Sequence, residues 1–197
     1  MTRSSPHAVL LVDGYNIIGA WSYLKKTRDD AGLEASRCQL IEALINYTTF
    51  QGFQTQIVFD AQYQNTCSTQ EDITQNLSVH YTDFGQTADT YIEKACACFY
   101  SYTNRVLPKA VLPRKPPHCS QSRLIVATSD RTQQLMVMGY GAEWMSAQQL
   151  AGEVESAAIR VRQHKPKKQS SSRFLANSID AKARQRLADL RLGLKDI

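Results

Sequence analysis

The segment AVLLVDGYNIIG, residues 8–19, contains the stretch that decides the fold. Its apolar run from Ala8 to Val12 is short and uninterrupted, which predicts a strand buried on both faces, as in a parallel sheet. The run stops at Asp13-Gly14, so an acidic side chain follows directly where the strand ends. We therefore expect a buried parallel strand that presents a carboxylate at its carboxyl end.

The same pattern recurs along the chain. The apolar stretch Gln54–Phe59 is followed by Asp60, and Arg123–Thr128 is followed by Ser129-Asp130. Weaker strands are predicted at 77–82 and 142–145, and helical stripes at 33–50, 88–102, 131–138 and 147–162. Thr87 is the expected N-cap of the second helix, and Gly139 the expected C′ residue of the third. This alternation predicts an α/β fold with three layers and a mostly parallel sheet.

Charge is distributed unevenly between the body of the chain and its end. Residues 160–197 carry 11 Lys and Arg against 3 Asp, whereas residues 1–159 carry 12 against 15 acidic residues. We expect a domain at 8–162 with a Pro-rich insertion at 103–122, followed by a basic, partly helical tail at 163–197. A basic tail favours a polyanionic partner, or it is simply a solvated segment. Its candidate RNA-binding residues are Lys165, Lys167 and Lys168.

Carboxylates at several strand ends predict a shared site. Because the carboxyl ends of parallel strands meet at one edge of the sheet, Asp13, Asp60 and Asp130 are expected to converge there. Asp89, in the first turn of the helix at 88–102, reaches the same edge. Four such carboxylates repel one another, and a divalent cation resolves that repulsion. Oxygen ligands without histidine or cysteine favour Mg²⁺ or Mn²⁺. Alternatively, each aspartate is only a turn or N-cap residue.

The motifs also resemble a known family. Residues 11–19, LVDGYNIIG, are similar to the signature that opens NYN domains, which belong to the PIN-like nuclease superfamily. The segments VFDA at 58–61, TAD at 87–89 with Ile92-Glu93, and ATSD at 127–130 follow the motif order of the YacP-like branch. That branch includes a bacterial ribosome-associated endoribonuclease that cuts messenger RNA during translation. The resemblance covers residues 8–160 and implies a metal-dependent endoribonuclease.

The resemblance also implies roles for individual residues. Asp13, Asp89 and Asp130 are expected to bind the metal, and Asp60 belongs to the second acidic motif. Asn16 orients Asp13 or contacts substrate phosphate. Thr128 and Ser129 support a metal ligand or bind phosphate, although Asn16 and Thr128 suit turn and cap positions equally well. Arg131, next to the last acidic motif, is a candidate phosphate contact.

Two functions of different kinds follow from these observations. The first is a metal-dependent endoribonuclease acting on RNA, with messenger RNA and the ribosome as expected partners and Mg²⁺ or Mn²⁺ as cofactor. The second is a catalytically inactive adaptor that binds RNA or the ribosome. The five cysteines form no CxxC pair, and no apolar run approaches the roughly 20 residues of a membrane span. A cytoplasmic protein without a membrane segment is therefore expected.

Overall fold

The computed structural model describes residues 8–60, 68–103 and 123–164. The chain divides into two units, Met1–Val161 and Arg162–Ile197, and the central sheet belongs to the first. Residues 104–122 of the expected insertion, the tail lysines and the expected helix of the tail lie outside the described residues. None of the helices in the three described ranges is long and apolar enough to cross a membrane.

A mostly parallel sheet forms the centre of this unit. Over the described ranges it has six strands in the order β3-β4-β2-β1-β5-β6. Strand β3 runs antiparallel to β4, and the remaining pairs are parallel. The strands are β1 (Val9–Asp13), β2 (Gln54–Phe59), β3 (Thr69–Thr74), β4 (Leu77–Tyr81), β5 (Leu124–Ala127) and β6 (Glu143–Met145). The predicted α/β class with a mostly parallel sheet is confirmed.

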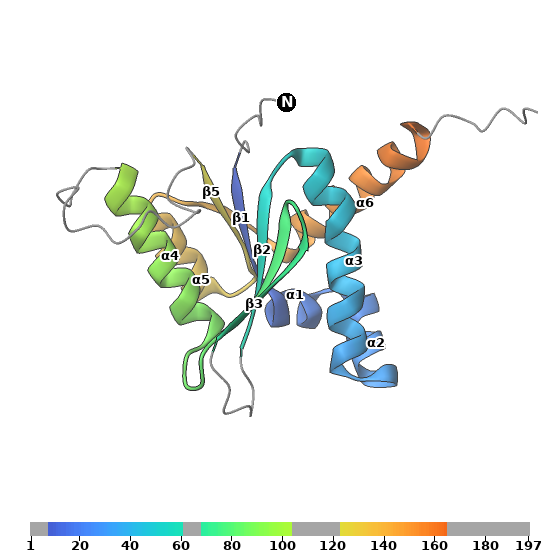
Figure 1. Cartoon of the computed structure of the whole chain (residues 1–197), viewed down its shortest axis with the longest axis horizontal. Helices are drawn as coiled ribbons and strands as arrows, with labels where there is room; N and C mark the ends of the chain where they lie inside the picture. The colour runs from blue at the N-terminus through green and yellow to red at the C-terminus, as the bar shows by residue number, and fades with distance from the viewer. Residues whose placement is uncertain (1–7, 61–67, 104–122, 165–197) are drawn as a thin grey trace, which may run out of the picture. The chain divides into compact units, whose positions relative to one another are not determined.

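Helices cover both faces of the sheet (Figure 1). One face carries α1 (Gly14–Ala20), α2 (Ser22–Ala31), α3 (Leu33–Gln51) and α6 (Ala147–His164). The opposite face carries α4 (Ala88–Thr103) and α5 (Arg131–Gly139). These two sets of helices and the sheet between them make three layers.

Strand β1 is central because its side chains supply both hydrophobic cores. Leu10 and Val12 belong to the core beneath α1, α2, α3 and α6, whereas Val9 and Leu11 belong to the core beneath α4 and α5. All four are almost completely buried, with exposed fractions of 1% or less. The alternation follows from the pleat, which sends successive side chains to opposite faces. An uninterrupted apolar run is therefore what this position requires.

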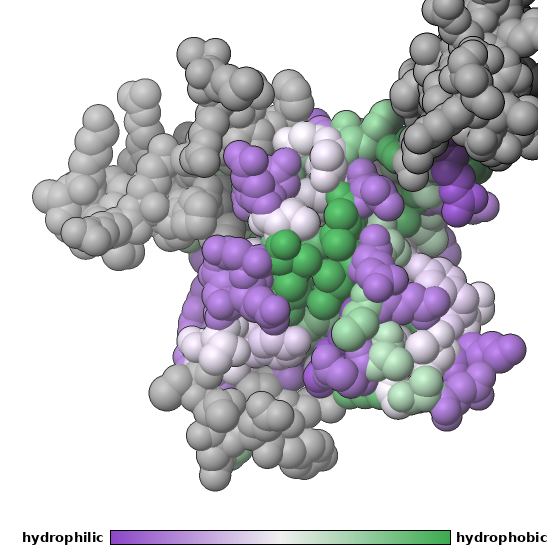
Figure 2. Space-filling model, turned by 45° about the vertical axis from the view of Figure 1, so that its right-hand side comes forward, coloured by the Kyte–Doolittle hydropathy of each residue, from purple (hydrophilic) through white to green (hydrophobic). Residues whose placement is uncertain are grey.

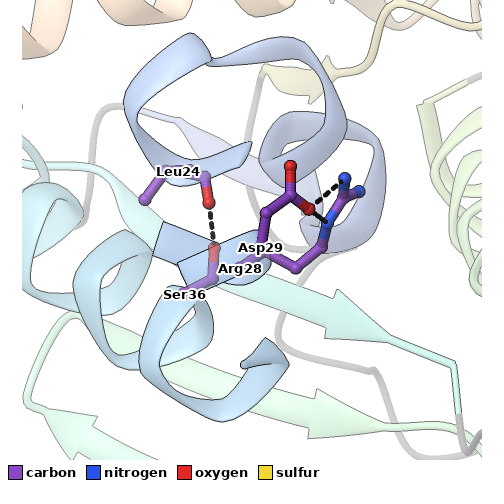
Figure 3. A network of polar contacts seen from close by, with 4 residues as sticks. All are labelled: Leu24, Arg28, Asp29 and Ser36. Carbon is purple, nitrogen blue, oxygen red and sulfur yellow. Dashed lines mark hydrogen bonds and ion pairs between the residues drawn. The ribbon is translucent and has the colours of Figure 1, made fainter. Parts of the chain in front are cut away.

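Helices α2 and α3 form a hairpin joined through Gly32. The fully buried Ser36 hydroxyl donates a 2.9 Å hydrogen bond to the Leu24 carbonyl, which joins the two helices across their interface (Figure 3). The nearby Arg28 to Asp29 ion pair is exposed and is expected to contribute little stability. The hairpin is thus stabilised mainly by buried contacts.

The surface of the unit is not uniformly polar. On the face drawn in Figure 2, hydrophobic side chains gather at the centre and hydrophilic side chains surround them. On α3, Ile41 and Ile45 are only partly buried, while Leu40 and Leu44 are fully buried in the same core. The apolar stripe of α3 is therefore wider than the part that the sheet covers.

Three elements were not expected from the sequence, namely α1, α2 and β3. Helix α1 has seven residues, two of them glycine, and forms because Asp13 caps it and Ile17 and Ile18 are buried. Strand β3, TQEDIT, is polar and largely exposed, so it has no apolar alternation to reveal it. Its ladder with β4 supplies the hydrogen bonds that define it as a strand.

The expected C′ position of α5 was wrong. Gly139 is helical, and the left-handed residue is Gly141, with φ of 73°. The Gly141 N–H donates to Met138 O and the Ala142 N–H to Val137 O, at 3.0 and 3.2 Å. Those two bonds form a Schellman motif, which satisfies the last carbonyls of the helix. The helix therefore runs one residue further than expected before it turns toward β6.

Gly14 permits the close contact between α1 and the end of β2. A Cβ atom built at Gly14 would lie 2.2 Å from the nearest ring atom of Phe59. Phe59 is fully buried, and its ring stands 5.0 Å from the Tyr15 ring and 5.8 Å from the Tyr81 ring, measured between centroids. Because neighbouring rings confine Phe59, it has little room to move aside. A larger residue at position 14 would push α1 away from the sheet.

We expect Gly14→Ala to lower the free energy of unfolding by about 1–3 kcal/mol, as overpacking of a core does. Gly19→Ala is the matched control, because Gly19 lies in the same helix and a Cβ there meets nothing within 4 Å. That control is expected to be neutral or to stabilise by up to about 1 kcal/mol through helix propensity. Urea unfolding at constant pH measures both variants. Equal stability of the two variants would contradict the packing role of Gly14.

Candidate active site

The carboxyl ends of β1, β2 and β5 bring acidic residues to one edge of the sheet. Asp13 ends β1, Asp60 follows β2 by one residue, and Asp130 lies three residues beyond β5. In the ladders Asp13 pairs with Val58, and Val12 pairs with Ala127. The strand order reverses between β1 and β5, and such a switch point is where open α/β sheets bind ligands.

Asp13 is the most buried of the four carboxylates, with 8% of its surface exposed. Its Oδ1 accepts a 3.1 Å bond from the Asn16 N–H and thereby caps α1. Burial, and to a smaller extent the charges of Asp89, Asp60 and Asp130, together raise the pKa of Asp13 to about 6, although the hydrogen bond from Asn16 opposes them. All four carboxylates therefore lie close enough to act on one another.

The other three carboxylates are more accessible, and each accepts a hydrogen bond. Asp130 Oδ1 accepts from the Thr132 and Gln133 N–H groups at 2.6 and 3.1 Å, so Asp130 caps α5. Asp60 Oδ1 accepts from the Ala88 N–H at the start of α4. Burial, then the charges of Asp130 and Asp60, raises the pKa of Asp89. The N-cap interpretation is thus correct for Asp13 and Asp130, and the carboxylates nevertheless form one electrostatic cluster.

Gln133 links two of these carboxylates and was not singled out from the sequence. Besides its main-chain bond to Asp130, its Nε2 donates a 2.7 Å bond to Asp89 Oδ1. The side chain is 4% exposed, and its buried Oε1 has no hydrogen-bond partner among the described residues. Gln133 follows the N-cap Asp130 by three residues, which is the spacing of a capping box. That spacing is the sequence signal that could have identified Gln133.

Asn16 and the ATSD segment join β1 to β5. Asn16 Oδ1 accepts a 2.7 Å bond from the Ser129 N–H, so its side chain faces the β5 loop and its main chain holds Asp13. Thr128 is fully buried, and its Oγ1 accepts a 3.0 Å bond from the Asp130 N–H. Ser129 Oγ accepts from the Ala147 N–H at 3.3 Å. In this arrangement Asn16 and Thr128 organise the end of β1 at Asp13 and the loop that carries Asp130.

The candidate substrate contacts differ in how far the structure describes them. Arg131 is exposed in the first turn of α5, and its side chain has no hydrogen bond or ion pair with another described residue. Lys165, Lys167 and Lys168 lie outside the described residues.

The donor set suits a hard divalent cation. Within the described ranges, no three acidic, histidine or cysteine side chains are close enough together to hold a metal ion by themselves. Mg²⁺ commonly keeps several waters and uses one or two carboxylates together with substrate phosphates, so it does not require three direct ligands. Asp13 and Asp130 each accept hydrogen bonds from described residues at Oδ1 alone. The second carboxylate oxygen of each is therefore left for a cation or its waters.

Asp13 makes the stability of the fold depend on pH. Its pKa is about 6 when folded against an ordinary 3.8, so the folded protein binds the extra proton between these values. The free energy of unfolding then falls as pH rises through this window, by about 3 kcal/mol in total. Asparagine accepts the same capping bond without a charge. We therefore expect Asp13→Asn, in EDTA, to match the parent near pH 4 and to be more stable above pH 7.

Urea unfolding of both proteins across this pH range measures the difference. If the free energies of unfolding of the parent and the variant differ by the same amount at every pH, Asp13 ionises in the folded protein as it does in the unfolded chain.

The chain is similar to a known protein family and to solved structures. A model of the YacP-like NYN domain matches residues 10–107 and 115–192. The Bacillus subtilis (strain 168) protein described as uncharacterized protein YacP is 32% identical over 153 residues, which are 78% of this chain and 78% of the relative. Two crystal structures of Bacillus subtilis Rae1 (YacP), one of them of a point mutant, are 29% identical with TM-scores of 0.57. The mutant structure covers 92% of this chain and 99% of its own, and the other covers 94% and 95%.

NYN domains are a PIN-like nuclease family, so the match indicates a nuclease in general. The family match and the 32% identity over most of both chains agree with the architecture and the acidic edge described above. The chain therefore belongs to the YacP-like NYN domain family.

Proposed function

We propose that this protein is a metal-dependent endoribonuclease whose site is the acidic edge of the sheet. The observation that carries the proposal is the coupling of the four carboxylates, since burial and the three neighbouring charges raise the pKa of Asp13 to about 6. A fold that needed only N-caps has no reason to concentrate negative charge in this way. Membership of a nuclease family supports the same conclusion.

In the proposed site, Asp13, Asp89 and Asp130 hold Mg²⁺ or Mn²⁺, and Asp60 acts through a water molecule. When bound, the cation supplies an activated water and stabilises the leaving oxygen of the phosphodiester. Asp13 takes the central place because it is the most buried of the four. Gln133 holds Asp89 in position, and the Asn16 main chain holds Asp13. Arg131 contacts a substrate phosphate from the start of α5.

The proposed substrate is messenger RNA in association with the ribosome, and the proposed compartment is the cytoplasm. The nuclease family supports RNA as the substrate. The ribosome is supported by the resemblance of the motifs to the ribosome-associated branch. The basic tail at 163–197, with Lys165, Lys167 and Lys168, supplies positive charge for a polyanion, because lysines that neutralise phosphates release counterions.

Asp13→Asn is expected to abolish metal-dependent cleavage of RNA, because it removes the buried charge while keeping the capping bond. The loss should be at least about 100-fold in rate if the cation supplies several kcal/mol to the transition state. Cleavage of end-labelled RNA with Mg²⁺ or Mn²⁺, alone and on translating ribosomes, measures the effect.

Asp29→Asn is the matched control, because Asp29 is exposed on α2 and makes the same loss of charge away from the acidic edge. Full cleavage by the Asp13 variant in the ribosomal assay would refute the catalytic assignment. A parent protein that associates with ribosomes or RNA but never cuts would support the adaptor function instead.

Removal of residues 165–197 is expected to weaken RNA binding and to flatten its dependence on salt. The deleted segment carries nine Lys and Arg, and truncation after His164 leaves α6 whole. Each lost phosphate contact should lower the slope of log affinity against log salt by about 1. Binding of single-stranded RNA at several salt concentrations provides the measurement. An unchanged slope would exclude the tail from RNA binding.

A further inference from the structure

An arginine surrounded by aromatic rings lies beside the acidic edge. The guanidinium of Arg37, on α3, stands 5.4 Å from the Tyr15 ring, 5.6 Å from the Phe59 ring and 5.8 Å from the Tyr81 ring, measured to the centroids. Such cation–π contacts fix the plane of a guanidinium while preserving its charge. Arg37 is therefore held in one orientation by residues of α1, β2 and β4.

The cluster adjoins the proposed catalytic residues along the chain. Tyr15 comes two residues after Asp13, and Phe59 immediately precedes Asp60. The Thr82 N–H, directly after Tyr81, bonds to the Phe59 carbonyl at 3.0 Å, which holds the ends of β2 and β4 together. The fold thus fixes a cation on the α3 side of the same sheet edge.

The hydrogen-bonding capacity of Arg37 is only partly used. Its Nη2 donates to the Tyr15 hydroxyl, and its Nη1 donates a 2.6 Å bond to Glu34 Oε2. Its Nε is buried without a hydrogen-bond partner among the described residues. A guanidinium has five N–H donors in a fork that matches carboxylate and phosphate oxygens. At least three donors of Arg37 are therefore unused by the described residues.

Glu34 marks the place where an anionic oxygen sits against this guanidinium. The Glu34 side chain is 72% exposed, whereas that of Arg37 is 20% exposed. Exposed ion pairs contribute only about 0–1 kcal/mol, so little opposes movement of Glu34 into solvent. Arginine–phosphate pairs are charge-assisted and frequently bidentate, so they are stronger than a single exposed carboxylate contact. A phosphate is therefore able to replace Glu34.

We propose that Arg37 and Tyr15 form a subsite for a phosphate of single-stranded RNA, flanking the acidic edge, and that Glu34 occupies this subsite when RNA is absent. The inference rests on the proposed function, because it assigns a contact of the same substrate strand. The aromatic rings hold the guanidinium ready for the phosphate, and the exposed glutamate competes with the phosphate for it. Loss of Glu34 and loss of Arg37 then have opposite effects on RNA affinity.

Anisotropy of a short fluorescein-labelled single-stranded RNA with the full chain in EDTA tests the subsite without cleavage. We expect Arg37→Gln to weaken binding about 10-fold and to lower the salt slope by about 1. Arg37→Lys should keep the slope but lose affinity, because lysine keeps the charge without the fork. Glu34→Gln should tighten binding roughly 2- to 5-fold, as removal of a weak competitor allows.

Glu42→Gln is the matched control, because Glu42 is exposed on the same helix and the variant loses the same charge. The gain from Glu34→Gln should exceed that from Glu42→Gln and should vanish in the Arg37→Gln background. Equal gains from the two glutamate variants, or a gain that persists without Arg37, would overturn the subsite. Glu34 is exposed, so this comparison holds even if Arg37→Gln destabilises the fold.

The same proteins separate the subsite from the nuclease activity. Suppose that Arg37→Gln weakens RNA binding and Glu34→Gln tightens it, while the parent protein shows no metal-dependent cutting. That result would support the subsite and refute the proposed function. Metal-dependent cutting together with equal binding by the Glu34 and Glu42 variants would refute the subsite alone.

Discussion

Mutual repulsion among the carboxylates at the end of the sheet is the constraint around which the structure is built. The fold opposes this repulsion with main-chain N–H groups from the first turns of three helices, which bond to Asp13, Asp60 and Asp130. Helix N-termini carry partial positive charge, so each of these donors also stabilises the carboxylate electrostatically. Each cap uses one oxygen. The capping and metal-binding interpretations of these aspartates are therefore compatible, because the caps position the carboxylates that a cation would need.

Packing behind the strand ends determines where those carboxylates point. Strand β1 ends at Asp13 and continues directly into α1, whose first residue, Gly14, packs against Phe59 just before Asp60. The position of Asp13 is thus coupled to that of Asp60, because Gly14 packs against the confined Phe59 ring. The same ring contributes to the aromatic surroundings of Arg37. In the two proposals together, Arg37 on one side of the strand ends and a cation held by the carboxylates on the other would hold a substrate strand between them.

The sequence predicts the elements whose burial imposes a pattern. Strand β1 has both faces buried and appears as an uninterrupted apolar run, and the aspartates after β1, β2 and β5 were assigned to one edge because parallel strands end together. The sequence does not predict β3, whose ladder needs no apolar side chain, or α1, which depends on a cap and on packing against Phe59. The capping-box spacing after Asp130 is a local signal for Gln133, but the bond of Gln133 to Asp89 joins elements distant along the chain. The contacts of Arg37 with the aromatic rings are equally distant, so no local pattern could reveal either set of contacts. Gly139 was misplaced because Gly141 lies only two residues away.

The two edge strands affect how this protein behaves when it is crowded with copies of itself. An open sheet edge offers unpaired N–H and C=O groups to any extended chain, and it is a route to aggregation. On one side the outermost strand, β3, places Glu71 and Asp72 at exposed positions, so an added strand would meet negative charge. On the other side β6 has only three residues, which is too short to template a stable ladder. Among the described strands, both borders of the sheet are therefore poor templates for pairing with a further extended chain.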